Sequence, residues 1–184
     1  MADIIDFEIT HVGDLNIDEE CYNNNSILDL NSLSNQYFKG NLLLTFDNYT
    51  YNINNVKIFK FLLDLFNTLH ECLSSVKKNA DYYILDQNHD PILKIEFKNY
   101  IIYLGYANNT YEFDFKEFYN ETCKALKKIF SLMYHEHPIL ALNNLNENRF
   151  FEKIRDDWVL DNFRSLPYKI RKDLLFTIGK PFLL

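Results

Sequence analysis

Hydrophobic and polar residues alternate with a period of two in three regions of the chain, a pattern typical of strands that bury one face. The first region is residues 4–12, and the second is residues 42–53, where Asp47 and Asn48 separate two runs as the turn of a hairpin would. The third region predicts a meander of four short strands: Tyr82–Leu85, Ile92–Phe97, Tyr100–Tyr106 and Thr110–Phe113.

Hydrophobic residues recur at spacings of three and four in other regions, which is the pattern of amphipathic helices. Residues 56–73 and 118–133 predict two long helices, and residues 150–162 and 167–177 predict two shorter ones. Residues 13–38 are rich in Asn, Ser and acids and predict a long loop with about one helical turn.

The order of these elements predicts an α+β fold, because strands and helices do not alternate as they do in a parallel sheet. We expect an antiparallel sheet of about six or seven strands with two long amphipathic helices on one face and a C-terminal helical segment. The chain of 184 residues is short enough for a single α+β domain. Residues 1–134 would form the sheet with two hairpin-helix units, and residues 135–184 the helical segment.

The sequence repeats itself at an offset of 60 residues, where Thr50-Tyr51 matches Thr110-Tyr111. In the second copy, Asp114 is predicted to cap a helix, and Phe113 to pack on Phe118 as a hydrophobic staple. In the first copy, Asn54 would be the cap. The repeat therefore indicates a strand that leads into a capped helix twice, by duplication or by convergence, rather than a repeated functional site.

Composition and charge narrow the classes of function. The net charge of −7 disfavours direct binding to nucleic acid, which needs a basic surface, and suits a basic protein partner. No hydrophobic run is long enough to cross a membrane, and the acidic N-terminus does not resemble a signal peptide. Three separated cysteines, Cys21, Cys72 and Cys123, favour free thiols in a reducing compartment, so we expect a cytoplasmic protein.

Motifs that carry chemistry are sparse in this chain. His135-Glu136-His137 is the densest group of metal-ligand types, but it follows a helix, where two histidines at i and i+2 do not share a face. Asp86 and Asp90 flank a predicted turn with His89 and could serve as an acid–base pair, but aspartate is an ordinary turn former, and the turn is the favoured interpretation. No glycine-rich phosphate loop is present. The sequence therefore predicts no catalytic residue, no metal site and no cofactor.

Two acidic groups next to aromatic residues remain as candidates for binding a partner. Acids steer a basic partner, and aromatic residues supply contact area. The alternative for the tryptophan is that it turns into the core. The predicted partner-binding residues are Asp14, Asp18, Glu19, Glu20, Tyr22, Asp156, Asp157, Trp158 and Asp161.

The segment Pro91–Phe130, "PILKIEFKNYIIYLGYANNTYEFDFKEFYNETCKALKKIF", resembles segments of small acidic bacterial immunity proteins from polymorphic-toxin and contact-dependent inhibition systems. The resemblance covers about a quarter of the chain and carries no functional residue with it. It implies a non-enzymatic inhibitor of one cognate toxin, often a basic nuclease.

Three other classes stay open on the sequence alone. One is a phage-encoded inhibitor of a bacterial defence protein, which would have the same acidity. Another is an enzyme with a scattered site that uses residues such as His89, Asp90, His135 and His137. The third is a structural or assembly subunit.

Overall fold

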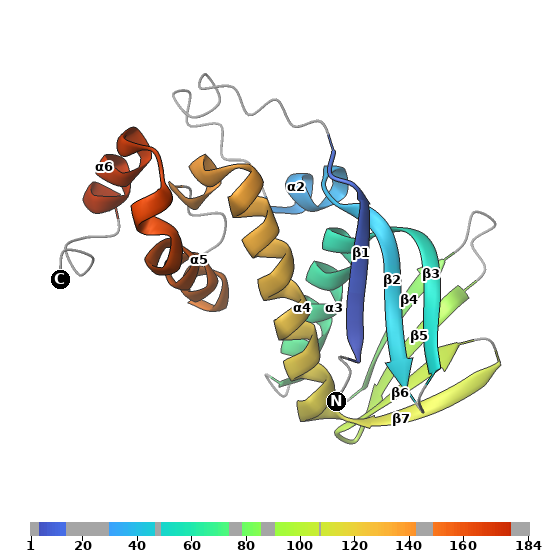
Figure 1. Ribbon diagram of the computed structural model, residues 1–184. Helices are drawn as coiled ribbons and strands as arrows, with labels where there is room; N and C mark the ends of the chain where they lie inside the picture. Colours follow the sequence, from blue (N-terminus) through green and yellow to red (C-terminus); the bar gives the residue numbers. More distant parts are fainter. Residues whose placement is uncertain are drawn as a thin grey trace. The chain divides into compact units, whose positions relative to one another are not determined.

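The structure is a computed structural model, and its backbone packs into two compact units (Figure 1). Unit 1 consists of Met1–Asp14 and Ser34–Leu126, and unit 2 of Leu15–Leu33 and Lys127–Leu184. The residues that the structure describes are 4–13, 30–46, 49–73, 79–85, 91–106, 108–142 and 149–177.

Unit 1 contains two antiparallel sheets, which we call sheet A and sheet B. Sheet A has the order β1-β2-β3, and sheet B is the meander β4-β5-β6-β7. The strands are β1 (Ile5–His11), β2 (Lys39–Phe46), β3 (Tyr49–Lys57), β4 (Asn79–Leu85), β5 (Pro91–Lys98), β6 (Ile101–Tyr106) and β7 (Asn109–Asp114).

The α+β class and the antiparallel pairing are confirmed, but the prediction of one sheet is wrong. The strand β3 pairs with β2 and then leads directly into a helix, so the chain leaves sheet A before β4 begins. The strand β4 pairs with β5 instead. The hydrophobic period indicates which face of a strand is buried. It does not indicate which strand lies next to it, because strand pairing depends on residues distant in sequence.

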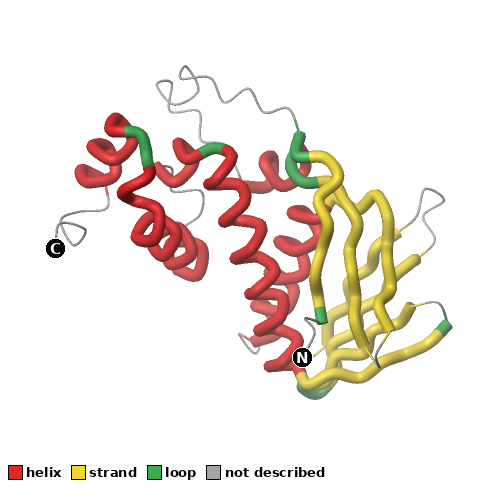
Figure 2. The backbone as a smooth tube through the Cα atoms, in the orientation of Figure 1, coloured by secondary structure: helices red, strands yellow, loops and turns green. Residues whose placement is uncertain are grey.

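The predicted helices are also present, as Figure 2 shows in red. The two long helices are α3 (Ile58–Leu73) and α4 (Phe115–Glu136), and the boundary between the units falls within α4. The remaining elements are α2 (Leu30–Gln36), the 3-10 turns η1 (Pro138–Leu142) and η2 (Phe163–Ser165), α5 (Arg149–Asn162) and α6 (Tyr168–Thr177). None of the described helices combines the length and hydrophobicity that crossing a membrane requires.

The core of unit 1 forms where the inward faces of the two sheets pack against α3. Alternate residues of β2 are buried, as the period of two predicts. On the side of sheet A, Phe38 packs edge-on against Phe59 of α3, with ring centroids 6.4 Å apart. On the side of sheet B, Tyr82 packs against Phe61 of α3, with ring centroids 5.8 Å apart. The helix is therefore buried on most sides, which explains its broad hydrophobic face.

Close backbone approach fixes the joint between β1 and β2. A side chain at Gly40 would place its Cβ 2.0 Å from the carbonyl oxygen of Glu8, so only glycine fits there. The start of β1 is tied to α4, because the backbone N–H of Ile4 donates to the carboxylate of Glu121 at 3.2 Å. Glu121 is only 8% exposed and also pairs with Lys124.

The structure confirms one of the two predicted helix caps and overturns the other. Asp114 ends β7 and accepts a hydrogen bond from the backbone N–H of Glu117 at 3.0 Å, as an N-cap does. The staple is also present, with the rings of Phe113 and Phe118 5.7 Å apart. Asn54 is not a cap, because β3 continues to Lys57.

A β-bulge explains why the first copy of the repeat differs. The pairing of β2 with β3 shifts between Gly40 and Leu42, which leaves an extra residue on β3. Asn55 lies in this bulge with a φ of 58°, a conformation that asparagine tolerates better than most residues. The bulge extends the strand, and α3 then begins at Ile58, whose N–H donates to the carbonyl of Phe38 at 2.9 Å.

The two copies of the repeat meet at equivalent positions. The hydroxyl groups of Tyr51 and Tyr111, which are 60 residues apart, share a hydrogen bond of 2.7 Å. Around them, the ring centroids of Phe46 and Tyr111 lie 4.1 Å apart, and those of Tyr51 and Tyr106 lie 5.1 Å apart. Tyr106 is 60 residues after Phe46, so these two contacts exchange equivalent positions of the repeat. The edge strands β3 and β7 therefore meet through equivalent residues of the two copies.

Unit 2 has a small aromatic core of its own. The rings of Phe130 and Phe151 lie 5.2 Å apart, and those of Tyr134 and Trp158 lie 5.3 Å apart. These contacts join the C-terminal part of α4 to α5. They orient α5 so that one of its faces stays in solvent.

Candidate functional site

A hollow of about 170 Å³ lies between α4 and α5 within unit 2, and we call it the α5 hollow. Its α5 residues follow the spacing i, i+3, i+4, i+7, which places them on one face of that helix. Its α4 residues are one turn apart. The lining residues are Lys127, Ser131, Ile154, Asp157, Trp158 and Asp161.

Within the described residues, neither carboxylate of the α5 hollow forms an ion pair. Asp157 and Asp161 are both exposed and lie one helical turn apart. Among the described lysines, arginines and histidines, none has a nitrogen within 4.0 Å of either carboxylate. Lys127, although it lines the same hollow, is therefore not their ion-pair partner.

Asp156 has a different environment from its neighbours. Its carboxylate accepts hydrogen bonds from Nε of Arg155, at 2.9 Å, and forms an ion pair with the same guanidinium. The pair lies beside Tyr134, whose pKa is raised above its usual value, chiefly by burial. The charge of Asp156 is thus partly neutralised within the chain, and Asp156 is not among the residues that line the α5 hollow.

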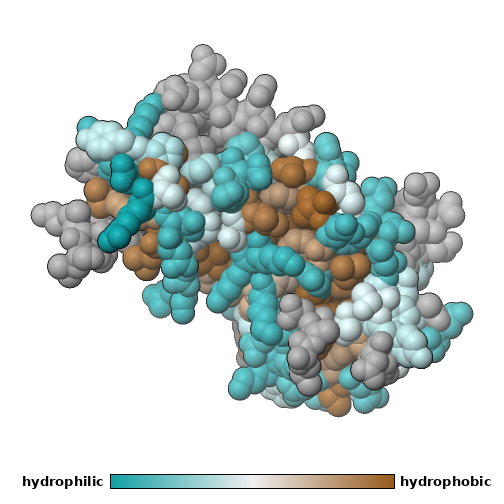
Figure 3. Space-filling view, viewed as in Figure 1, coloured by the Kyte–Doolittle hydropathy of each residue, from teal (hydrophilic) through white to brown (hydrophobic). Residues whose placement is uncertain are grey.

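Trp158 lies at the floor of the α5 hollow rather than on its rim. Its side chain is 8% exposed and packs on Tyr134, so most of the indole belongs to the core. The exposed hydrophobic residue of this helix is Leu160, at 57%. Figure 3 shows hydrophobic atoms beside hydrophilic ones over the region of α5. The sequence indicated the tryptophan, but Lys127 and Ser131 were not among the predicted residues.

The other predicted acidic group lies outside the described residues. It comprises Asp14, Asp18, Glu19, Glu20 and Tyr22. The distribution of formal charge along the chain nevertheless shows that this segment is strongly acidic. The described residues hold 16 of the 19 lysines and arginines and 16 of the 26 acids, so their formal charges cancel. The net charge of −7 comes from the remaining residues, and residues 14–29 contain five acids without a lysine or arginine.

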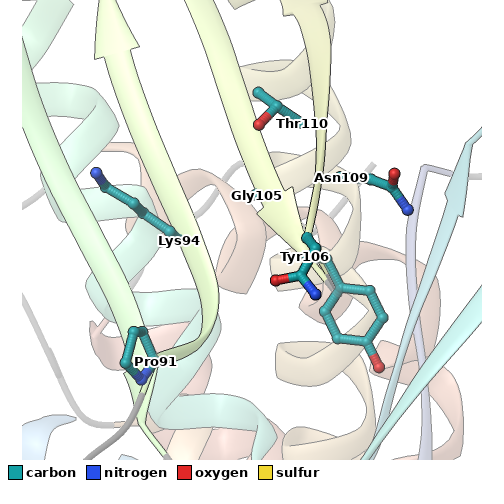
Figure 4. Close-up of a pocket in the computed structure, with 7 residues that line it drawn as sticks. Pro91, Lys94, Gly105, Tyr106, Asn109 and Thr110 are labelled. Carbon is teal, nitrogen blue, oxygen red and sulfur yellow. The ribbon is translucent and has the colours of Figure 1, made fainter.

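A second hollow, of about 250 Å³, lies on sheet B and is shown in Figure 4. Gly105 opens it by leaving space between Lys94 and Thr110. The ammonium group of Lys94 already pairs with Glu96 and lies 5.7 Å from the ring of Tyr83. Because its cation is engaged, this hollow offers fewer free charges than the α5 hollow.

The structure also brings together three reactive side chains that the sequence did not connect. The hydroxyl of Tyr119 lies 3.4 Å from Nδ1 of His70 and is hydrogen-bonded to Cys123. Burial, followed by the influence of Cys123, raises the pKa of Tyr119 to about 12. Tyr119 therefore keeps its proton at neutral pH. Of the two helical cysteines, Cys72 is buried and Cys123 is half-buried.

The histidines considered as metal ligands do not form a site in the described part of the chain. His135 and Glu136 end α4, and His137 follows them. Within the described ranges, no three His, Cys, Asp or Glu side chains lie together in a way that could hold a metal ion. His89 and Asp90 lie outside the described residues.

The α5 hollow combines the features that a basic partner requires. Its two carboxylates are exposed, and Ile154 and Trp158 give it an apolar floor. Such an arrangement can accept a cationic side chain together with the apolar stem that carries it. A comparison of the chain with known protein families, with curated proteins and with solved structures finds no match.

Proposed function

We propose that this protein is a non-enzymatic, cytoplasmic inhibitor that binds a basic protein through an acidic surface, in the manner of an immunity protein that neutralises a toxin. The observation that carries the proposal is a pair of exposed carboxylates, Asp157 and Asp161, that have no ion-pair partner among the described residues and line a hollow with an apolar floor. Partner recognition by steering acids around an apolar anchor suits both features.

The acidic segment of residues 14–29 supports the same proposal. Its five acids account for most of the net charge of −7. A concentrated negative charge speeds the encounter with a basic partner, and it does so most strongly at low ionic strength. We assign this segment to steering and the α5 hollow to docking.

The test is affinity capture from a lysate of the native host, followed by purification of the captured protein and measurement of its dissociation constant. We expect a basic protein whose affinity falls as salt increases. Replacing Asp157→Asn together with Asp161→Asn should weaken the complex about tenfold or more, because two charge-assisted contacts are lost. Neutralising Asp14, Asp18, Glu19 and Glu20 should mainly slow association.

A control of equal charge makes this test specific. Asp81→Asn with Glu112→Gln removes the same two charges from the outer face of sheet B, where both side chains are exposed. The control should bind like the wild type. A captured partner that binds the α5 variant and the control equally well would contradict the proposed docking surface. A captured protein that belongs to a bacterial defence system would instead identify the phage-encoded alternative.

A further inference from the structure

We propose that the α5 hollow is a pocket for one arginine side chain of the partner. This inference rests on the proposed function, and it goes further by naming the chemical group that the hollow recognises. Two observations carry it: the apolar floor and the spacing of the two carboxylates.

The floor suits the hydrocarbon stem of a long cationic side chain. Ile154 and Trp158 are 4% and 8% exposed and both line the hollow, so they give it a largely buried apolar floor. Arginine and lysine both lay their methylene groups along such surfaces while the charged end stays wet. The indole of Trp158 adds a further preference, because tryptophan is the best aromatic partner for a cation and arginine is the more frequent cation.

The carboxylates distinguish arginine from lysine. Asp157 and Asp161 are separated by one helical turn, which places their Cβ atoms about 5–6 Å apart. A guanidinium carries five N–H donors in a planar fork and can bridge two acceptors at that separation. An ammonium group is a compact charge that satisfies one carboxylate at a time. The hydroxyl of Ser131 is a third possible acceptor on the opposite wall.

Lys127 modulates the pocket from its rim. Its side chain lines the hollow and is exposed, yet its ammonium lies more than 4.0 Å from both carboxylates in the described structure. It therefore leaves the acids unpaired while it repels an incoming cation. Removing the charge of Lys127 should strengthen binding of a cationic side chain.

Trp158 supplies a direct readout because it is the only tryptophan in the chain. The test records the indole N–H signal of the full-length, ¹⁵N-labelled protein during titration with a capped Gly-Arg-Gly peptide. Matched peptides carry lysine, or citrulline, the neutral analogue of arginine. We expect a saturable shift of the indole signal with arginine, a weaker response with lysine and none with citrulline.

The variants sharpen the same titration. Asp157→Asn with Asp161→Asn should weaken arginine binding about tenfold, and Lys127→Gln should tighten it. The Asp81→Asn with Glu112→Gln control should respond like the wild type. An indole signal that does not move, that moves equally with citrulline, or that responds equally in the Asp157/Asp161 variant would overturn the arginine pocket.

The two proposals fail separately. If the wild type captures a basic protein through Asp157 and Asp161 but the arginine peptide leaves the indole signal unchanged, the arginine pocket is wrong and the docking surface stands. If the peptide binds as expected but no basic protein depends on the two acids, the pocket stands and the inhibitor function is wrong.

Discussion

At the scale of single residues, Asp114 shows how one side chain sets the start of a helix. Its carboxylate satisfies a backbone N–H that would otherwise have no partner within the helix. Asn54 occupies the matching position of the repeat but lies within β3, where an N-cap has no helix to serve. The residue type is therefore not sufficient, and the backbone that follows decides its role.

This difference predicts unequal effects of two similar substitutions. Asp114→Ala should lower the free energy of unfolding by about 1 kcal/mol through loss of the cap. Asn54→Ala should change it by less than about 0.5 kcal/mol, because Asn54 is exposed on the strand. Urea unfolding of both variants checks this. Equal losses in the two variants would mean that Asp114 does not act as a cap.

Tyr119 predicts a pH dependence at high pH. Its pKa is raised to about 12 in the folded state, above the ordinary value of 10.0. Between those values the folded state holds a proton that the unfolded state has lost, so stability falls as pH rises. The contribution is fully present below about pH 10.

Urea midpoints of the wild type and of Tyr119→Phe, measured at about pH 9 and about pH 11, test this expectation. The wild type should lose more stability between the two conditions than the variant, which has no phenol at that position. Tyr82 and Tyr134, whose pKa values are also raised, are retained in both proteins and cancel in the comparison. Identical losses would show that Tyr119 ionises normally in the fold.

At the scale of elements, the structure shows that the two copies of the repeat contact each other, which the sequence did not indicate. The offset of 60 predicted two similar strand-to-helix units, and the structure places the second strands of both units against each other. Phe46 of the first copy packs on Tyr111 of the second copy, and Tyr106 of the second copy packs on Tyr51 of the first. The repeat in the sequence thus corresponds to a contact between its two copies in the fold, whether it arose by duplication or by convergence.

The shared hydrogen bond predicts coupling between the two tyrosines. Tyr51→Phe and Tyr111→Phe should each cost about 1 kcal/mol, because each leaves the other hydroxyl without this partner. The double variant should lose clearly less than the two single losses combined. A double-mutant cycle from urea unfolding measures the difference. Strict additivity would indicate that the two hydroxyl groups do not interact in solution.

Local patterns predicted the elements well because burial repeats with the period of each element. Strands β5, β6 and β7 and helices α5 and α6 begin and end within about two residues of their expected bounds. The bulge at Asn55 and the division into two sheets were not predictable, since both depend on which distant strands pair. The cap at Asn54 was misplaced for the same reason.

At the scale of the whole molecule, charge is distributed unevenly along the chain. The described residues are neutral in sum, while residues 14–29 are strongly acidic. The sequence could identify the acids Asp157 and Asp161, because they flank a tryptophan in a predicted helix. It could not identify the hollow, because Lys127 and Ser131 reach it from a different helix.

The central claim is that the protein inhibits a toxic basic partner by binding it. The measurement that tests it most directly is the growth of cells that express the captured partner, with this protein expressed at increasing levels. We predict that the wild type and the Asp81→Asn with Glu112→Gln control restore growth, and that the Asp157→Asn with Asp161→Asn variant restores it less at equal expression. Growth that the wild type does not restore, or that all three proteins restore equally, would contradict the account.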